Sequence, residues 1–118
     1  ELASKVRDIF ESVDTVIGYN VSFDVRMVKQ NFGIDVPKEK IHDLLPVFKQ
    51  QFPSGGHKLN DAVQTYCPEI YEEYSSDAHS SSTDTYATLM VFLKQVEIET
   101  DKTMRATYYS DENDFLLE

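Results

Sequence analysis

A short run of β-branched and aromatic residues, Thr15 to Tyr19, constrains the fold of this chain more than any other stretch. Both faces of the run are apolar, which is typical of a strand that lies buried within a parallel sheet. Asn20 follows at its carboxyl end, and a helical pattern begins at Ser22 and ends at Gly33. The sequence therefore predicts a buried parallel strand that turns tightly into a helix.

The segments around this strand predict an alternating α/β order. Apolar residues recur at helical spacing over residues 2–13, and Ile41–His42 is expected to form a second strand that ends at Asp43. Asp43 is then expected to cap a helix over residues 44–52, and further helices are expected over residues 59–67 and 80–96. A sheet of only two strands is too small for this many helices to cover both of its faces. We therefore expect a fold truncated at the N-terminus, with its opening strands missing.

Composition limits the size of the domain and the kind of partner it can have. We expect residues 1–96 to be the C-terminal portion of one domain and residues 97–118 to be an acidic tail, docked or partly mobile. The net charge of −10 argues against a broad electrostatic grip on a nucleic-acid backbone, but not against a metal-bridged contact with one phosphate. The single cysteine, Cys67, and the lack of an apolar run of about 18 residues predict a reducing, cytoplasmic setting without a membrane partner.

His79 and Asp84 form the first candidate site motif. Three serines and a threonine follow His79, and such residues are preferred at helix N-caps, so a helix is expected to begin near residues 80–82. Asp84 then lies in the first helical turn, and His79 lies in the loop before the cap. A loop imidazole that titrates near neutrality suits a general base. The alternative is an ordinary solvent-exposed histidine.

A second candidate motif, Asn20-x-x-Phe23-Asp24, surrounds the end of the buried strand. Open α/β sheets gather ligands at the carboxyl ends of their strands. We expect Phe23 to face the core and fix the turn, while Asn20 holds exposed amides or a substrate and Asp24 occupies the first turn of the helix. The alternative is a turn asparagine followed by a charge that favours a helix start.

Together these two motifs resemble the second and third exonuclease motifs of the DnaQ-like 3′→5′ exonucleases, the branch named for four acids and a histidine. The runs Ile41–Leu45 and His57–Leu59 are also similar to the middle of that family, and the likeness extends over residues 16–93. Within that family, the run from Asp77 to Thr88 is more similar to the DNA polymerase III epsilon-type proofreading exonucleases than to the RNA-trimming members. The resemblance implies a ribonuclease H-like exonuclease fold.

The resemblance also implies a two-metal mechanism that uses Mg²⁺ or Mn²⁺. Asp84 would bind the ion that carries the attacking water, Asp24 would support the second ion, and His79 would take a proton from the water. Asn20 and Phe23 would contact the substrate. The implied partner is the 3′ end of single-stranded DNA, or RNA, and the implied activity is removal of nucleoside monophosphates, with a DNA polymerase subunit as a further partner.

The chain departs from this family in one respect. The family's first motif, Asp-x-Glu on an opening strand, supplies two metal-binding carboxylates, and Asp-x-Glu occurs nowhere in these 118 residues. Glu97-Ile98-Glu99 resembles it locally, but its connection to the preceding helix is too short to cross a sheet. We therefore expect the chain alone to bind metal poorly, to be inactive, and to associate with itself or a missing part through an exposed sheet.

Two alternatives to an exonuclease remain open. One is a non-catalytic ribonuclease H-like module that binds a nucleic-acid end or a polymerase partner, and the other is an unrelated α/β domain. Further side chains that fit a contact with phosphate or base, but fit a surface or packing role better, are His42, His57, Arg26, Lys29, Lys58, Tyr66, Tyr71 and Tyr74.

Overall fold

The computed structural model describes residues 1–76 and 80–117, with backbone alone for residues 107–117. The chain falls into two compact units, Glu1–His57 and Lys58–Glu118. Each unit contains buried apolar side chains, and each unit is described below by itself. The candidate residues Asn20, Phe23 and Asp24 belong to the first unit, and Asp84 belongs to the second.

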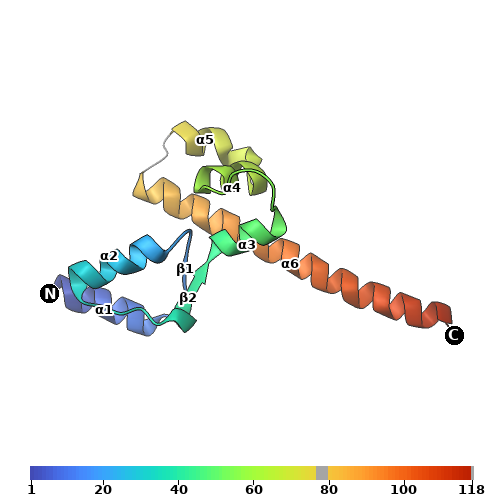
Figure 1. The fold of residues 1–118 in the computed structure, drawn as a ribbon, viewed down its shortest axis with the longest axis horizontal. Helices are drawn as coiled ribbons and strands as arrows, with labels where there is room; N and C mark the ends of the chain where they lie inside the picture. The colour runs from blue at the N-terminus through green and yellow to red at the C-terminus, as the bar shows by residue number, and fades with distance from the viewer. Residues whose placement is uncertain (77–79, 118) are drawn as a thin grey trace. The chain divides into compact units, whose positions relative to one another are not determined.

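The first unit is built on a small parallel sheet (Figure 1). Strands β1 (Val16–Gly18) and β2 (Ile41–Asp43) pair in parallel, with Val16 opposite Ile41 and Gly18 opposite Asp43. The two predicted strands and their parallel pairing are thus confirmed. Because parallel strands end at the same edge, this register brings Asp43 to the edge where the chain leaves β1.

Three helices and a short 3₁₀ turn complete this unit. They are α1 (Leu2–Ser12), α2 (Ser22–Phe32), the 3₁₀ turn Lys38–Lys40 and α3 (Leu44–Gln51). Gly33 ends α2 in the left-handed conformation, with φ at 66° and its N–H donating to the Lys29 carbonyl, as the sequence predicts. The largest buried side chains are those of Leu44 and Phe48 on α3.

The sheet of this unit is only partly covered by the rest of the unit. Within the described residues β1 pairs with β2 alone, and Ile17 at the centre of β1 is 39% exposed. The prediction that this strand is buried is therefore wrong, since no residue of β1 is fully buried, although parallel sheets are normally covered on both faces. The expected self-association through this sheet stays a prediction.

The second unit is helical. It consists of α4 (Leu59–Tyr66), the 3₁₀ turn Pro68–Ile70, α5 (Tyr71–Ser76) and α6 (Ser81–Leu117). Helices α4 and α5 pack against the N-terminal part of α6, and the rest of α6 extends beyond them (Figure 1). The core contains Ala62, Val63, Tyr66, Cys67, Tyr74, Ala87 and Val91.

Helix α6 is longer than the sequence pattern predicts. The apolar pattern decays after Val96, where we expect the domain to end, but the helix continues to Leu117. No glycine or proline occurs between Ser81 and Leu117, so nothing in the local sequence stops the helix once it has formed. From Glu97 to Ala106 its side chains are mostly exposed. The predicted end of the helix at residue 96 is therefore wrong.

Three buried titratable groups make the stability of the second unit sensitive to alkaline pH. Burial raises the pKa of the Cys67 thiol and of the Tyr66 and Tyr74 hydroxyls above their ordinary values of 9.0 and 10.0. The unfolded chain therefore loses these protons first. The contribution of these three groups to the free energy of unfolding should be fully present below about pH 9. It should be lost as the pH rises toward their raised pKa values.

Urea unfolding of the chain, followed by circular dichroism between pH 7 and pH 11, measures this loss. The Tyr66→Phe variant removes one of the three groups, so its midpoint should fall less between pH 9 and pH 11 than that of the unchanged chain. Equal pH dependence in both proteins would show that Tyr66 takes no part.

Candidate active site

The turn from β1 to α2 is held by the carboxylate of Asp43. Its Oδ1 accepts hydrogen bonds from the N–H groups of Asn20 at 2.8 Å and Leu45 at 3.0 Å, and its Oδ2 accepts one from Val21 at 3.1 Å. The bond to Leu45 is the N-cap of α3 that the sequence predicts. The two bonds to the turn were not predicted, and they place Asp43 beside the candidate motif.

The three motif residues of the first unit lie at the start of α2. Asn20, Phe23 and Asp24 are all exposed, and Asp24 lies in the first helical turn as predicted. Phe23 is 60% exposed, so the expectation that it faces the core is wrong. Val21, the N-cap residue of α2, is buried, and Phe23 follows it by about 200° around the helix axis. The expected contact of the exposed Phe23 ring with substrate stays a prediction.

A small apolar groove of about 90 Å³ lies beside Asp24. It is formed by β1, β2, α1 and α2, and Asp24 is its only acidic lining residue. The lining residues are Phe10, Val16, Ile17, Gly18, Val21, Asp24, Val25, Val28, Val36 and Ile41. Asp24 therefore forms part of the lining of an apolar groove.

Gly18 fits this turn only because it has no side chain. A Cβ at Gly18 would overlap Cγ1 of the buried Val21. The Gly18→Ala variant should therefore lose about 1–3 kcal/mol of the free energy of unfolding, which urea titration measures.

The Gly18→Ala/Val21→Ala double variant removes the atom that clashes. If the overlap is the cause, the double variant should lose less stability than the sum of the two single changes. Strict additivity would mean that the glycine is needed for another reason.

His57 has a structural role in the first unit. Its carbonyl accepts a hydrogen bond from the Tyr19 hydroxyl, and its Nε2 lies 2.8 Å from the Phe52 carbonyl oxygen. Its ring packs edge to face against Phe48 with centroids 4.8 Å apart. These contacts favour a packing role for His57 over a contact with phosphate. They also link the 52–57 loop to Tyr19, the residue before Asn20.

Helix α2 carries two bases, Arg26 and Lys29. Lys29 pairs with Asp35 at 3.0 Å, and both side chains are exposed, so the pair contributes little to stability. Arg26 is exposed on the same helix. His42 lies in β2 opposite Ile17, where it is half-buried.

The second unit carries Asp84 in the first turn of α6. The Ser80 hydroxyl accepts a hydrogen bond from the Thr83 N–H at 3.2 Å, and the Asp84 N–H donates to the Ser80 carbonyl at 3.0 Å. Ser80 thus caps the helix as the sequence predicts. His79, the predicted general base, lies outside the described residues.

The Asp84 carboxylate has a hydrogen-bond partner, but one of its two oxygens has none among the described residues. Tyr74 makes a side-chain hydrogen bond to Asp84, and the pKa of Tyr74 is raised by its burial first and by the Asp84 charge second. The Oδ1 atom of Asp84 is buried and has no hydrogen-bond partner among the described residues. A buried carboxylate oxygen without a partner is costly, and a bound cation is one explanation for it.

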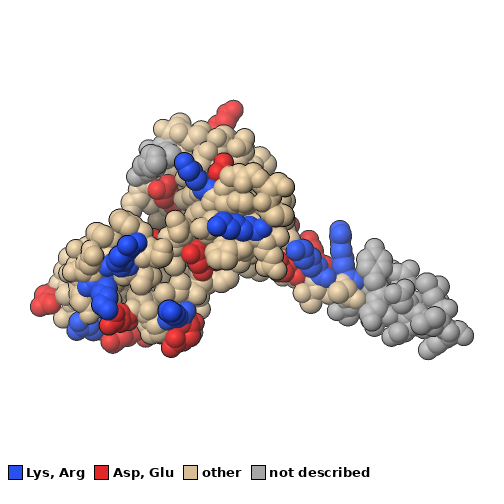
Figure 2. All heavy atoms as spheres, viewed as in Figure 1, with Lys and Arg blue, Asp and Glu red and all other residues tan. Residues whose placement is uncertain are grey.

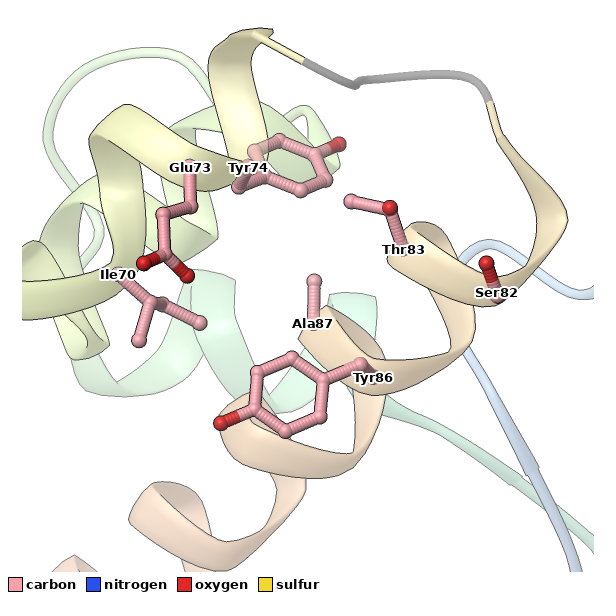
Figure 3. A pocket seen from close by; sticks show the side chains of 7 residues that line it. All are labelled: Ile70, Glu73, Tyr74, Ser82, Thr83, Tyr86 and Ala87. Atoms are coloured by element: carbon pink, nitrogen blue, oxygen red, sulfur yellow. The ribbon is translucent and has the colours of Figure 1, made fainter.

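A pocket of about 300 Å³ opens between α5 and the first turns of α6 (Figure 3). Side chains of Glu73, Tyr74, Thr83 and Tyr86 surround it, together with Ile70, Ser82 and Ala87. Its volume is at the lower end of the range for small-molecule sites. Tyr74 is buried, which agrees with the packing interpretation for this residue.

The other two tyrosines that were considered for stacking on a base also make internal contacts. The Tyr66 hydroxyl accepts a hydrogen bond from Gln95 Nε2 at 3.4 Å, and both residues are buried. The Tyr71 hydroxyl accepts one from Asn60 Nδ2 at 3.3 Å. Packing is therefore the better interpretation for both.

The donor atoms partly fit the divalent ions that the motifs imply. Carboxylate oxygens are the ligands that Mg²⁺ and Mn²⁺ prefer, and the orphaned oxygen of Asp84 suits such an ion. Among the residues that the structure describes, no three acids, histidines or cysteines lie together as a ligand set. Asp24 and Asp84 belong to different units, so the structure describes each as a separate carboxylate.

Charge is distributed unequally between the two units. Residues 1–57 carry seven bases and eight acids, whereas residues 58–118 carry four bases and thirteen acids. Figure 2 shows blue and red side chains interspersed on the described part of the face it presents, without a continuous basic patch. The nearly neutral first unit repels a nucleic-acid backbone less than the acidic second unit does.

Comparisons with protein-family models, with curated proteins and with solved structures find no match to this chain. The likeness to DnaQ-like exonucleases therefore depends on the motif residues themselves. Among the described residues, no helix has the length and apolar character needed to cross a membrane.

Proposed function

We propose that this chain contributes the Asn20–Asp24 and His79–Asp84 motifs to a metal-dependent 3′→5′ exonuclease with a ribonuclease H-like fold. The observation that carries the proposal is the half-buried Asp84 carboxylate, whose Oδ1 has no protein partner among the described residues. Asp84 lies in the first turn of α6, five residues after His79 in the sequence. Asp24 supports the proposal because it occupies the first turn after the end of a parallel strand.

Each residue has a role in this reaction. Two divalent ions, Mg²⁺ or Mn²⁺, would stabilise the attacking and leaving oxygens of an in-line displacement at phosphorus. Asp84 and Asp24 would each hold an ion through a carboxylate oxygen, and His79 would accept the proton of the attacking water on an imidazole nitrogen. The Asn20 amide and the exposed Phe23 ring would orient the nucleotide at the 3′ end.

A non-catalytic module is the second candidate. The described residues contain no ligand set of three, and the family's Asp-x-Glu motif is absent from the sequence. A module of this kind would bind a nucleic-acid end or a polymerase partner without cleaving. Binding and cleavage must therefore be measured separately.

The test uses single-stranded DNA and RNA oligonucleotides labelled at the 3′ end, with Mg²⁺ or Mn²⁺. It is performed on this chain and on the full product of the reading frame that contains it. Stepwise release of 3′ nucleotides that requires metal supports the exonuclease. Binding of the oligonucleotide without cleavage by either protein supports the non-catalytic module, and absence of both contradicts both proposals.

A further inference from the structure

Asn20 adopts a backbone conformation that most residues avoid. Its φ is 54°, and it is the only non-glycine residue with positive φ in the described chain. Asparagine tolerates the left-handed region better than most residues, but the conformation persists only where the surroundings hold it. Such outliers gather at functional sites, where they preorganise a side chain.

The surroundings that hold Asn20 are supplied by one carboxylate. In the left-handed conformation of Asn20, followed by the right-handed conformation of Val21, consecutive N–H groups converge into a concave anion-binding arrangement. Here the anion is Asp43, which accepts from the Asn20 N–H at 2.8 Å and from the Val21 N–H at 3.1 Å. Bonds from N–H to a charged acceptor are about twice as strong as neutral ones.

The same carboxylate also controls where α2 begins. Val21 is the N-cap residue of α2, and its carbonyl accepts the first helical bond from Val25 at 2.9 Å. Asp24 lies three residues after this cap. Fixing the N–H of Val21 therefore fixes the start of the helical turn that carries the Asp24 carboxylate.

We infer that Asp43 is a positioning residue of the proposed exonuclease site: its carboxylate fills the amide concavity of the β1–α2 turn and so orients Asn20 and Asp24. This inference rests on the proposed function. Asp43 itself does not contact substrate or metal in this account. Its effect is exerted through the backbone of the turn, so loss of the carboxylate should weaken metal binding at Asp24 without unfolding the unit.

The test compares the unchanged chain with the Asp43→Ala variant by NMR. The backbone coupling constants and the amide proton shifts of Asn20 and Val21 report the turn, and Mn²⁺-induced broadening of the Asp24 amide reports metal binding. Asp43→Ala should move Asn20 out of the left-handed region and lower the Mn²⁺ affinity at Asp24 by about 10- to 100-fold, as loss of residues that support metal ligands usually does.

The matched control is Asp61→Ala. Asp61 is also a helix-start carboxylate, since its Oδ2 accepts from the Lys58 N–H at 3.0 Å, but it belongs to the second unit. It should leave both readouts for Asn20 and Asp24 unchanged. Urea unfolding of both variants shows whether either change acts through global stability.

Added formate provides a rescue that a purely structural residue would not give. In Asp43→Ala, formate can occupy the space of the lost carboxylate and accept the same two N–H groups. It should restore part of the Asn20 conformation and of the Mn²⁺ broadening, whereas sodium chloride at equal ionic strength should not. An Asp43→Ala chain with unchanged Asn20 coupling constants and unchanged broadening would overturn the inference.

Failure of the proposed function gives a different result. If the unchanged chain shows no Mn²⁺ broadening at Asp24, the metal site is wrong. A loss of the left-handed Asn20 conformation in Asp43→Ala, restored by formate, would still show that Asp43 holds the turn. Retention of that conformation would overturn the positioning role whatever the metal does.

Discussion

The Asp84→Asn variant is expected to lose metal-dependent cleavage without losing stability. Cleavage by the full reading-frame product should fall by at least about 100-fold, because changes to residues that only support metal ligands already cost about 10- to 100-fold. The free energy of unfolding of the chain should stay the same or rise by up to about 1–3 kcal/mol, because the change removes a charge whose Oδ1 is buried without a partner. Opposite effects on activity and stability are the mark of a functional residue.

The control for this variant is Asp101→Asn on the same helix. Asp101 is exposed in the structure, so neither cleavage nor the urea midpoint should change by more than the usual surface effect of about 0.5 kcal/mol. Single-turnover degradation of a labelled oligonucleotide gives the activity, and urea titration gives the stability. Full activity in Asp84→Asn would remove Asp84 from the mechanism.

The Phe48→Ala variant is expected to have the largest effect on stability in the first unit. Phe48 is 1% exposed, and its ring packs edge to face on His57, whose carbonyl is hydrogen-bonded to Tyr19. Loss of a buried phenylalanine costs about 3–5 kcal/mol, which is a large part of the total stability of a small domain. Urea unfolding monitored by circular dichroism measures this loss.

The Phe52→Ala variant is the matched control for Phe48→Ala. Phe52 contacts Phe48 with centroids 6.3 Å apart, but it is 38% exposed, so less apolar surface is buried. Its replacement should cost clearly less than that of Phe48. Equal losses in the two variants would mean that the packing around α3 differs from the structure.

Except for α5, which was not predicted, the order of helices and strands could be predicted from the sequence because local signals agreed with it. Thr15–Tyr19 contains a strand, Gly33 stops α2, and Asp43 caps α3, each for a reason that depends on neighbouring residues alone. The end of α6 could not be predicted in this way. Its apolar pattern decays at Val96, but the residues that follow still favour a helix.

Contacts distant in the sequence were the part of the candidate site that the sequence did not reveal. Asp43 follows Asn20 by 23 residues, and only the parallel pairing of Gly18 with Asp43 brings them to one edge. The predicted strands contained this information, since two parallel strands end together. The hydrogen bond between Tyr74 and Asp84 depends on how α5 packs against α6, which no local pattern specifies.

The prediction that Phe23 faces the core was wrong because local sequence does not specify which side of a helix packs inward. An aromatic residue at the start of a helix was expected to face the core, but the buried residue at the start of α2 is the N-cap residue Val21. Phe23 then lies on the exposed side. The ribonuclease H-like fold and the exonuclease assignment remain predictions that depend on the motif residues.

The most direct test of the account is a Mn²⁺ titration of this chain followed by NMR. The central claim is that Asp24 and Asp84 each hold a divalent ion. It predicts that Mn²⁺ broadens the amide signals of both residues before those of exposed acids elsewhere on the chain, and that Asp84→Asn abolishes the broadening at residue 84. Broadening at neither residue, or at exposed acids such as Glu97 and Glu99 instead, would contradict the claim.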